Sequence, residues 1–188
     1  MEALTRSAVA LAVVVLLASH AFGAPPAGDV SAGEYEIKAA FLQHFAQFVV
    51  WPLNVLPINA PLVVALVGDD PFGRAIDDVI AGKHANGHPI IIRRLRWNDS
   101  FAGCHIVYIG SSELQHLGTI LDAARVYSIL TVADLDRFAD HGGMIGLVMV
   151  QNRVRFDINP NAASDAHLKI SSKLLQVARE IRGTEGAR

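Results

Sequence analysis

Apolar residues recur at two different spacings along this chain, and the spacing distinguishes predicted helices from predicted strands. Between Glu34 and Val50 no Gly or Pro occurs, and large apolar residues recur at helical intervals, at Ile37, Phe41, Phe45 and Phe48. This pattern predicts an amphipathic helix. Trp51-Pro52 is expected to end it, because the residue before a proline is disfavoured in the α conformation.

Continuous apolar runs predict the strands of a buried sheet. Leu62–Val67 is apolar throughout and is followed by Gly68, as expected for a parallel strand that is covered on both faces. Shorter β-branched runs predict three further strands, at Pro89–Ile92, Ile106–Ile109 and Ser128–Val132. A helical stretch, Ser112–Ala123, lies between the last two. Strands that alternate with helices favour a mostly parallel sheet.

The pattern changes after residue 144. Only Gln151-Asn152 separates the predicted strands Ile145–Val150 and Arg153–Ile158, and so short a connection requires an antiparallel hairpin. In the second strand, Val154 and every second residue after it are apolar, which predicts one core face and one charged outer face. The predicted fold is a single-domain α/β fold with a mixed sheet, mostly parallel with a C-terminal antiparallel hairpin, flanked by helices.

The turn Gly68–Gly73 follows a strand at the end of the sheet where open α/β proteins usually bind ligands. Asp69 and Asp70 place carboxylates where a phosphate would need free backbone N–H groups and positive charge. A capped turn is therefore favoured over a nucleotide loop. A helix is expected to start at Asp70, which would cap it, with Pro71 in its first turn.

After the hairpin, Asn159-Pro160 is a typical pair of cap and first-turn residues. A final helical region is expected to extend to about Ile181, with a break near His167. Its apolar stripe, which is predicted to pack on the sheet, consists of Ala163, Ala166, Ile170, Leu174, Val177 and Ile181.

The first residues have the pattern of an export signal. Arg6 precedes an apolar run that is too short to span a bilayer, and small residues follow at Ala21 and Gly23. We therefore predict a signal peptide at 1–23, with cleavage after residue 21 as the alternative. The expected remainder is a flexible segment at 24–33, one domain at 34–182 and a disordered tail at 183–188, in an exported, soluble, periplasmic protein with no direct membrane insertion.

Charge and cysteine content exclude several classes of protein. The formal net charge is −2, which argues against an electrostatic nucleic-acid binder. Cys104 is the only cysteine, so it has no partner for an intramolecular disulfide and is expected to be buried or paired with another chain. No residue pattern indicates a catalytic site, a cofactor or a metal, so we predict that the protein is not an enzyme.

Several residue groups suggest a site but also have a purely structural explanation. Cys104 and His105 are adjacent in a strand and therefore point to opposite faces, which disfavours a thiol nucleophile paired with that histidine. His84 and His88 have helical metal-pair spacing, but Gly87 and Pro89 disfavour a helix there. A basic and aromatic cluster after a predicted strand fits either an anionic ligand or a solvated strand end, and consists of Arg93, Arg94, Arg96 and Trp97.

Five short motifs in fixed order resemble those of the YfiR/HmsC-like family: Phe41 to Trp51-Pro52, Gly68 to Gly73, Leu130-Thr131-Val132, Gly142-Gly143-Met144-Ile145, and Val154-Arg155-Phe156-Asp157-Ile158-Asn159. The resemblance extends from about Glu34 to Ala178. It implies a periplasmic, often dimeric repressor that binds the sensor region of an inner-membrane GGDEF-type diguanylate cyclase and lowers cyclic di-GMP synthesis. It also implies a possible second partner, an OmpA-like outer-membrane lipoprotein that sequesters the repressor.

The motifs also supply the candidate site residues. Trp51, Arg155 and Asp157 are the candidates for ligand or partner binding. The motif residues with an expected structural role are Pro52, Gly68, Gly142, Gly143, Phe156 and Asn159. The best-known member of the family contains intramolecular disulfides; Cys104 resembles one such position, but this chain has no second cysteine for the pair.

Two other functions compete with the regulatory one. A periplasmic small-ligand receptor for a transporter or sensor would have a similar pattern of strands and helices, although a two-lobed receptor normally requires a longer chain. A thiol enzyme would require Cys104 to be exposed and reactive. The family motifs favour the regulator.

Overall fold

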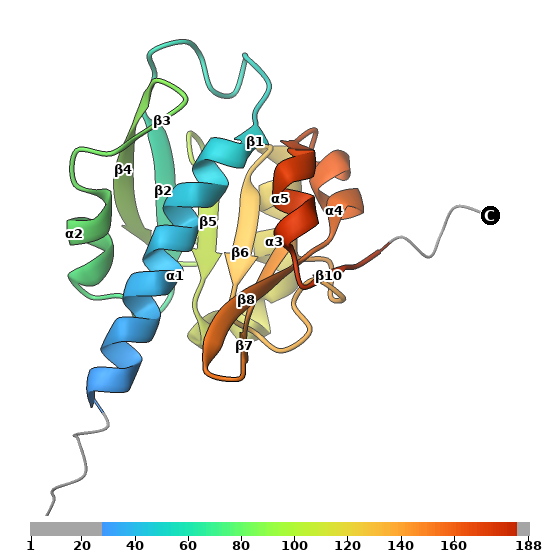
Figure 1. Cartoon of the computed structure of the whole chain (residues 1–188). Helices are drawn as coiled ribbons and strands as arrows, with labels where there is room; N and C mark the ends of the chain where they lie inside the picture. Colours follow the sequence, from blue (N-terminus) through green and yellow to red (C-terminus); the bar gives the residue numbers. More distant parts are fainter. Residues whose placement is uncertain (1–27, 184–188) are drawn as a thin grey trace, which may run out of the picture.

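An eight-stranded sheet forms the centre of the molecule, in the order β10-β8-β7-β6-β5-β2-β4-β3 (Figure 1). The structure is a computed structural model that describes residues 28–183. The strands of this sheet are β2 (Leu62–Val67), β3 (His84–Ala85), β4 (His88–Leu95), β5 (Ile106–Ile109), β6 (Leu130–Ala133), β7 (Ile145–Val150), β8 (Arg153–Ile158) and β10 (Glu180–Ile181).

The sheet is mixed, as predicted. β4, β2, β5, β6 and β7 are parallel neighbours, and β7 and β8 form the predicted antiparallel hairpin. Gln151 and Asn152, which connect them, both have positive φ, as a tight two-residue hairpin turn requires. β3 pairs antiparallel with β4, and β10 pairs parallel with β8.

Helices cover both faces of the sheet. They are α1 (Gly28–Phe48), α2 (Ala75–Ile80), the 3-10 helix η1 (Ser111–His116), α3 (Leu117–Val126), α4 (Pro160–Asp165) and α5 (Ser172–Val177). A separate two-stranded antiparallel sheet joins β1 (Val49–Val50) to β9 (Lys169–Ile170) near the C-terminal end of α1.

Alternating side chains of the buried strands divide the core in two. In β2, Leu62, Val64 and Leu66 pack in the cluster that contains α1, α2, α4 and α5. Val63 and the residues that alternate with it pack on the other face with α3. Both faces of the strand are thus buried, which explains its uninterrupted apolar sequence.

The first helix differs from its prediction in extent and in buried face. It begins at Gly28, inside the segment 24–33 that we expected to be flexible, and ends at Phe48. Ile37 is 50% exposed, whereas Ala39 and Leu42 are fully buried. Steps of four residues drift by about 40° around a helix of 3.6 residues per turn, so the predicted stripe crosses the buried face at an angle.

The predicted helix at Asp70 starts five residues later, at Ala75. The Asp70 carboxylate accepts hydrogen bonds from the N–H groups of Phe72 and Gly73, at 2.9 and 3.2 Å, so it caps a turn rather than the helix. Gly73 has a φ of 53°, which interrupts any helix that begins at Asp70.

The final helical region is also interrupted. Asn159 caps α4 as predicted, by accepting a hydrogen bond from the Ala162 N–H. The break falls at His167, which has a φ of 59°. The chain then forms β9, α5 and β10, so Ile181 lies in a strand and the prediction that the helical region extends to about Ile181 is wrong.

The remaining predictions on segments concern the chain ends. The predicted signal peptide at 1–23 and residues 184–188 of the predicted tail lie outside the described residues. Within 28–183, no helix combines the length and apolarity that crossing a bilayer would require.

Candidate functional site

Trp51 lies at the end of the molecule where α1 ends, and its side chain is 6% exposed. Its indole N–H donates a hydrogen bond to the His105 carbonyl oxygen at 3.1 Å. The His105 ring in turn accepts from the Val63 N–H at 3.0 Å and lies 3.1 Å from the Val55 carbonyl oxygen. Burial lowers the pKa of His105, so the ring is neutral and its Nε2 donates to Val55. Trp51 is thereby fixed against the amino end of the sheet.

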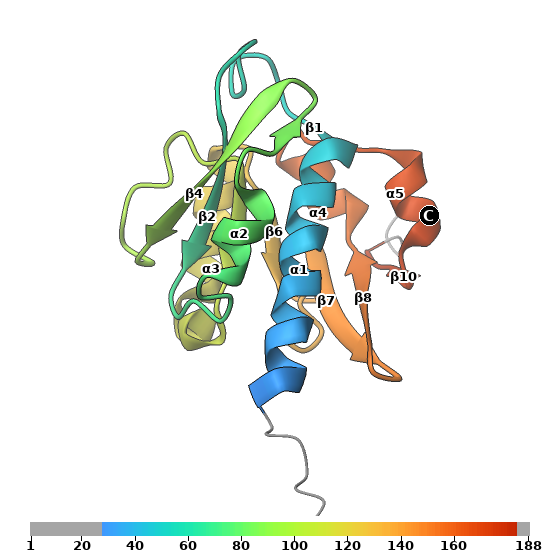
Figure 2. The ribbon, with the colours of Figure 1, turned by 60° about the vertical axis from the view of Figure 1, so that its left-hand side comes forward.

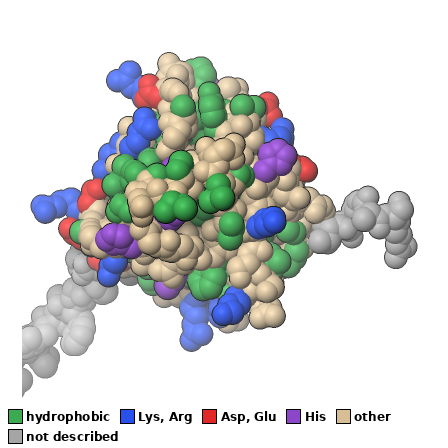
Figure 3. Space-filling view, turned by 90° about the horizontal axis from the view of Figure 1, so that it is seen from above, with side chains coloured by type: hydrophobic (Ala, Val, Ile, Leu, Met, Phe, Trp, Pro, Cys, Tyr) green, Lys and Arg blue, Asp and Glu red, His purple; other side chains and the backbone are tan. Residues whose placement is uncertain are grey.

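A groove of about 560 Å³ opens beside Trp51. Two apolar residues on its wall project into solvent, Val50 with 60% exposure and Leu53 with 75%. Its lining contains no carboxylate, and Lys173 is its only Lys or Arg. Figure 3, which views this end of the molecule from above, shows hydrophobic side chains gathered across much of the face. Exposed apolar residues beside a groove are typical of an interaction surface. We call this surface the amino-end groove.

The usual ligand position of an open α/β sheet, between the carboxyl ends of β2 and β5, is closed. The Asp69 N–H donates to the Ser112 hydroxyl at 3.0 Å, which joins the two loops. A Cβ on Gly110 would lie 2.6 Å from the Asp69 carbonyl oxygen, and a Cβ on Gly68 would lie 2.4 Å from the Ser112 hydroxyl. The loops therefore fill this crevice, and the turn after β2 has the capped form that the sequence favoured.

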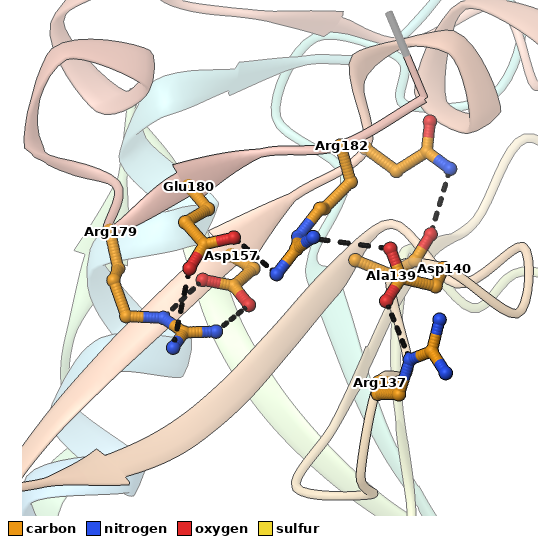
Figure 4. A network of polar contacts seen from close by, with 8 residues as sticks. Arg137, Ala139, Asp140, Asp157, Arg179, Glu180 and Arg182 are labelled. Carbon is orange, nitrogen blue, oxygen red and sulfur yellow. Dashed lines mark hydrogen bonds and ion pairs between the residues drawn. The ribbon is translucent and has the colours of Figure 1, made fainter. Parts of the chain in front are cut away.

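Arg155 and Asp157 do not form a shared site. Both belong to the face of β8 that was predicted to be charged, but Arg155 is exposed and Asp157 is only 6% exposed. Arg179 binds the Asp157 carboxylate with two nitrogens, and its Nε lies 2.7 Å from Oδ1 (Figure 4). The prediction that Asp157 lies on an outward face is therefore wrong, because residues 179–182 cover it. We call these residues the C-terminal segment.

The Asp157–Arg179 pair belongs to a larger ionic network that holds the C-terminal segment (Figure 4). Arg182 contacts Glu180 and Asp140, and Arg137 binds Asp140 at 3.1 Å. Backbone bonds from the N–H groups of residues 179 and 182 to β8 add to this attachment. The network contains three guanidinium groups and three carboxylates, so its formal charge is balanced. This arrangement stabilises the segment and leaves no free charge for a ligand.

Asp157→Asn is expected to lower the free energy of unfolding by about 2 kcal/mol, because a buried charge-assisted pair is replaced by a weaker neutral one. Amide hydrogen exchange at residues 179 and 182 should accelerate, which NMR can measure alongside urea unfolding. Asp122→Asn breaks an exposed pair on α3 with Arg125 and should change stability by less than about 0.5 kcal/mol. Equal effects of the two substitutions would contradict the conclusion that the Asp157–Arg179 pair stabilises the C-terminal segment.

Most of the motif residues with an expected structural role have contacts of that kind. The Pro52 carbonyl accepts from the N–H groups of residues 55 and 56. Phe156 packs edge-on against Phe41 and Phe45 of α1, with ring centroids 5.4 and 5.2 Å away. The Asn159 side chain also donates to the Ala139 carbonyl at 2.9 Å. These residues connect the hairpin, α1 and α4.

The other candidate groups have structural partners. Arg94 binds Asp70 and Asp77 at 2.8 and 2.7 Å, so it ties β4 to α2 and to the turn before it. Trp97 stacks face to face on His116 with centroids 4.1 Å apart. Cys104 is free and buried, and burial raises its thiol pKa, which disfavours the reactive thiolate. Among residues 28–183, no group of three or more potential metal ligands comes together.

A buried ionic cluster that was not predicted from the sequence lies near the middle of α1. Lys38 is 3% exposed, and its ammonium lies 2.5 Å from Glu34 Oε1 and 2.6 Å from Asp134 Oδ2. Asp134 follows β6 directly and also accepts from the Tyr108 hydroxyl at 2.7 Å. The signal was present, because Lys38 lies four residues before Leu42, on the apolar face of the helix.

The charges in this cluster are stabilised by one another. Burial alone would raise the pKa of Asp134, but hydrogen bonds from Lys38 and Tyr108 outweigh it and hold the pKa below its usual value. Burial alone would lower the pKa of Lys38, and the two carboxylates reverse that shift. Both groups are therefore charged at neutral pH, and the pair fixes the middle of α1 to the end of β6.

Comparison with one solved structure, a protein from Vibrio cholerae, supports the α/β fold. The chain is similar to a conserved domain protein from Vibrio cholerae, with a TM-score of 0.52 and 10% identity over 79% of this chain. It is also similar to an ABC domain in complex with L-Trp from Streptococcus pneumoniae, with a TM-score of 0.49 and 10% identity over 74% of this chain. The chain spans 60% and 59% of these two structures, respectively. At such identities the likeness concerns the fold alone.

Comparison with protein families is more specific. No curated protein matches the chain significantly. The YfiR/HmsC-like family matches residues 35–179, which run from the first turns of α1 to the start of the C-terminal segment. The match includes Trp51, the glycines before β7 and the whole β7–β8 hairpin. Because it extends over well more than half of the sequence, the chain belongs to the YfiR/HmsC-like family.

Proposed function

We propose that this protein is a periplasmic repressor that binds the sensor region of an inner-membrane GGDEF-type diguanylate cyclase and lowers cyclic di-GMP synthesis, and with it biofilm formation. The family match over residues 35–179 carries this proposal, because the family is a regulatory one that acts with such a cyclase. Export through a signal peptide at 1–23 is part of the proposal.

The amino-end groove is the surface that we assign to the cyclase. It presents Val50 and Leu53 to solvent, and burial of one such side chain contributes about 1.5–3 kcal/mol. The ring of His105 and the core contacts of Trp51 fix the groove wall, so little ordering is needed on binding. This surface can therefore bind a partner protein without a catalytic step.

Repression of this kind requires a difference in affinity between two states of the cyclase. A repressor that binds the inactive state more tightly shifts the population toward that state. The change in free energy between the two states cannot exceed the difference between the two binding free energies. A shift from 1:99 to 99:1 requires about 5.5 kcal/mol. Full burial of a few side chains such as Leu53 in only one state would supply much of this difference.

Two further partners belong to the proposal. An OmpA-like outer-membrane lipoprotein would relieve repression by sequestering the repressor, and the repressor itself would act as a homodimer. The family match supports a membrane cyclase as partner in general terms, and the lipoprotein and the homodimer are additions to the proposal.

Deletion of the gene tests the function directly. Cellular cyclic di-GMP is expected to rise in the deletion strain and to return to its original level with the intact gene. A version that lacks residues 1–23 should fail to restore it. An unchanged level in the deletion strain would remove the proposal.

Leu53→Asp and Val50→Asp test the surface. Each is expected to weaken cyclase binding more than tenfold and to raise cyclic di-GMP toward the deletion level, because a charge replaces an apolar contact. Val126→Asp is the matched control, since Val126 is 78% exposed but lies on α3. Thermal unfolding should be nearly unchanged in all three. If the Val126 variant also loses repression, the amino-end groove is not the cyclase surface.

The volume of the groove, about 560 Å³, favours one alternative, a small-ligand receptor for a transporter or sensor. This alternative predicts an unchanged cyclic di-GMP level in the deletion strain. It also predicts that a small apolar metabolite raises the melting temperature of the wild type but not of the Leu53 variant.

A further inference from the structure

Strands β6 and β7 separate soon after they meet. Only two residue pairs join them, Val132 with Ile145 and Ala133 with Gly146. β7 then continues to Val150 with β8 as its only strand neighbour. Figure 2 shows the β7–β8 hairpin extending beyond the end of β6. From Leu147 onward, the side of β7 that faces away from β8 has no strand partner within the described chain.

The backbone of β7 exposes hydrogen-bonding groups on this open side. The Met144 carbonyl accepts from the Asn159 N–H, so Met144 directs that group toward the β8 side. Because residues of a strand alternate in direction, Gly146, Val148 and Val150 also pair with β8, and Met149 directs its N–H and carbonyl away from it. Met149 is 44% exposed. An open edge of this kind is a template for a further strand.

A cleft of about 410 Å³ lies beside the open edge of β7. Its other walls come from the first half of α1 and from the loop that follows β6. Among the described residues, three carboxylates line it, from Glu34, Asp134 and Asp136, and Lys38 is its only cation. Lys38 is bound by Glu34 and Asp134. Asp136 is exposed and has no ion-pair partner among residues 28–183, so the cleft has an excess of negative charge.

We propose that the open edge of β7 binds an extended segment of a partner protein that carries basic side chains. The segment adds to the hairpin as a strand, its backbone pairs with Met149, and its cations approach Asp136 and Glu34. Backbone pairing supplies the affinity in such strand addition, and side-chain pockets supply the selectivity. The excess of carboxylates selects a basic segment over an acidic one.

The opposite edge of the hairpin is less suited to strand addition. β10 already pairs with Asp157 and Ile158 of β8. The free part of β8 carries the exposed Arg153 and Arg155, and charged side chains on an edge oppose unwanted pairing. The edge of β7, in contrast to that of β8, has the acidic cleft beside it. This site borders the first half of α1 and the amino-end groove borders its last residues, with no lining residue in common, so the inference does not depend on the proposed function.

The test uses synthetic octapeptides and the purified exported chain. A peptide of alternating lysine and valine is compared with one of alternating glutamate and valine, and binding is followed by NMR at the amides of residues 147–150. At 50 mM NaCl the lysine peptide is expected to bind at least tenfold more tightly. The advantage should fall below threefold at 500 mM NaCl, because salt screens the exposed carboxylates. Equal affinities at low salt, or shifts elsewhere only, would overturn the proposal.

Two controls separate strand addition from a purely ionic contact. Methylation of alternate peptide nitrogens removes backbone donors from the lysine peptide and should abolish binding without altering its charge. Met149→Pro removes the open N–H and should also abolish binding, whereas Met149→Leu should bind as the wild type does. Asp136→Asn should weaken binding two- to fivefold. Unchanged binding of the methylated peptide would contradict the proposal even if the proline variant did not fold.

Discussion

Lys38→Met is expected to lower the free energy of unfolding by about 3–5 kcal/mol at pH 7, because it leaves the carboxylates of Asp134 and Glu34 without their shared cation. The methionine retains most of the apolar stem that Lys38 packs on α1, so the loss reflects mainly the charge. Urea unfolding monitored by circular dichroism measures it. Lys83→Met, at an exposed position after α2, should change stability by less than about 0.5 kcal/mol.

The Lys38→Met penalty should depend on pH. In the wild type, the pKa of Asp134 is below its usual value, so its contribution to stability is present above the unfolded pKa of about 3.9 and is lost as the pH falls through the folded pKa. Without Lys38, burial dominates and raises the pKa of Asp134, so the variant gains stability on acidification. The difference between the two proteins should therefore shrink between pH 7 and pH 4. A constant difference would show that packing, not charge, causes the loss.

Gly143→Ala is the second substitution for which we expect a large effect, a loss of about 3 kcal/mol. A Cβ at this position would lie 2.2 Å from the Phe138 ring, and Phe138 is almost fully buried, so one of the two must move. The Gly143 N–H also donates to the Phe138 carbonyl at 3.0 Å, which opposes a shift of the backbone. Thermal or urea unfolding measures the loss.

The neighbouring glycine provides a matched comparison. Gly142 has a φ of 90°, but a Cβ there would lie 3.8 Å from Leu121 and would meet no buried ring. Gly142→Ala should therefore cost only the backbone strain, about 1–2 kcal/mol. In a Phe138→Leu background, the Gly143→Ala cost should fall by at least about 1 kcal/mol, because the clash is relieved. Additive effects of the two substitutions would exclude the predicted clash.

The strands were predicted better than the helices. The bounds of β2, β5, β7 and β8 agree with their sequence predictions, because these runs are short, are rich in β-branched residues or alternate strictly. Helix ends depend on single backbone angles instead. The positive φ of Gly73 interrupts the helix predicted to start at Asp70, and apolar spacing does not reveal such an angle, whereas the break at His167 was predicted.

For the candidate site residues, too, local patterns did not reveal the contacts with distant segments. Alternation correctly gave the face of β8 to which Asp157 belongs, but it did not show that residues 179–182 cover that face. Trp51 was recognised as a motif residue, yet its bond to His105 joins residues that are 54 positions apart. The buried Lys38–Asp134 pair joins residues 96 positions apart, so the local pattern that places Lys38 near apolar residues does not identify its partner.

The sequence by itself determined the α/β class, the central parallel strands, the C-terminal hairpin and the family resemblance, because each depends on local periodicity or on short motifs. The tertiary structure alone decided which charges are buried and paired, that the loops after β2 and β5 close the usual ligand crevice, and that β7 extends beyond β6 with an open edge. These features arise where distant segments meet. The energy of a charge or an open strand depends on those neighbours and on the water that they exclude.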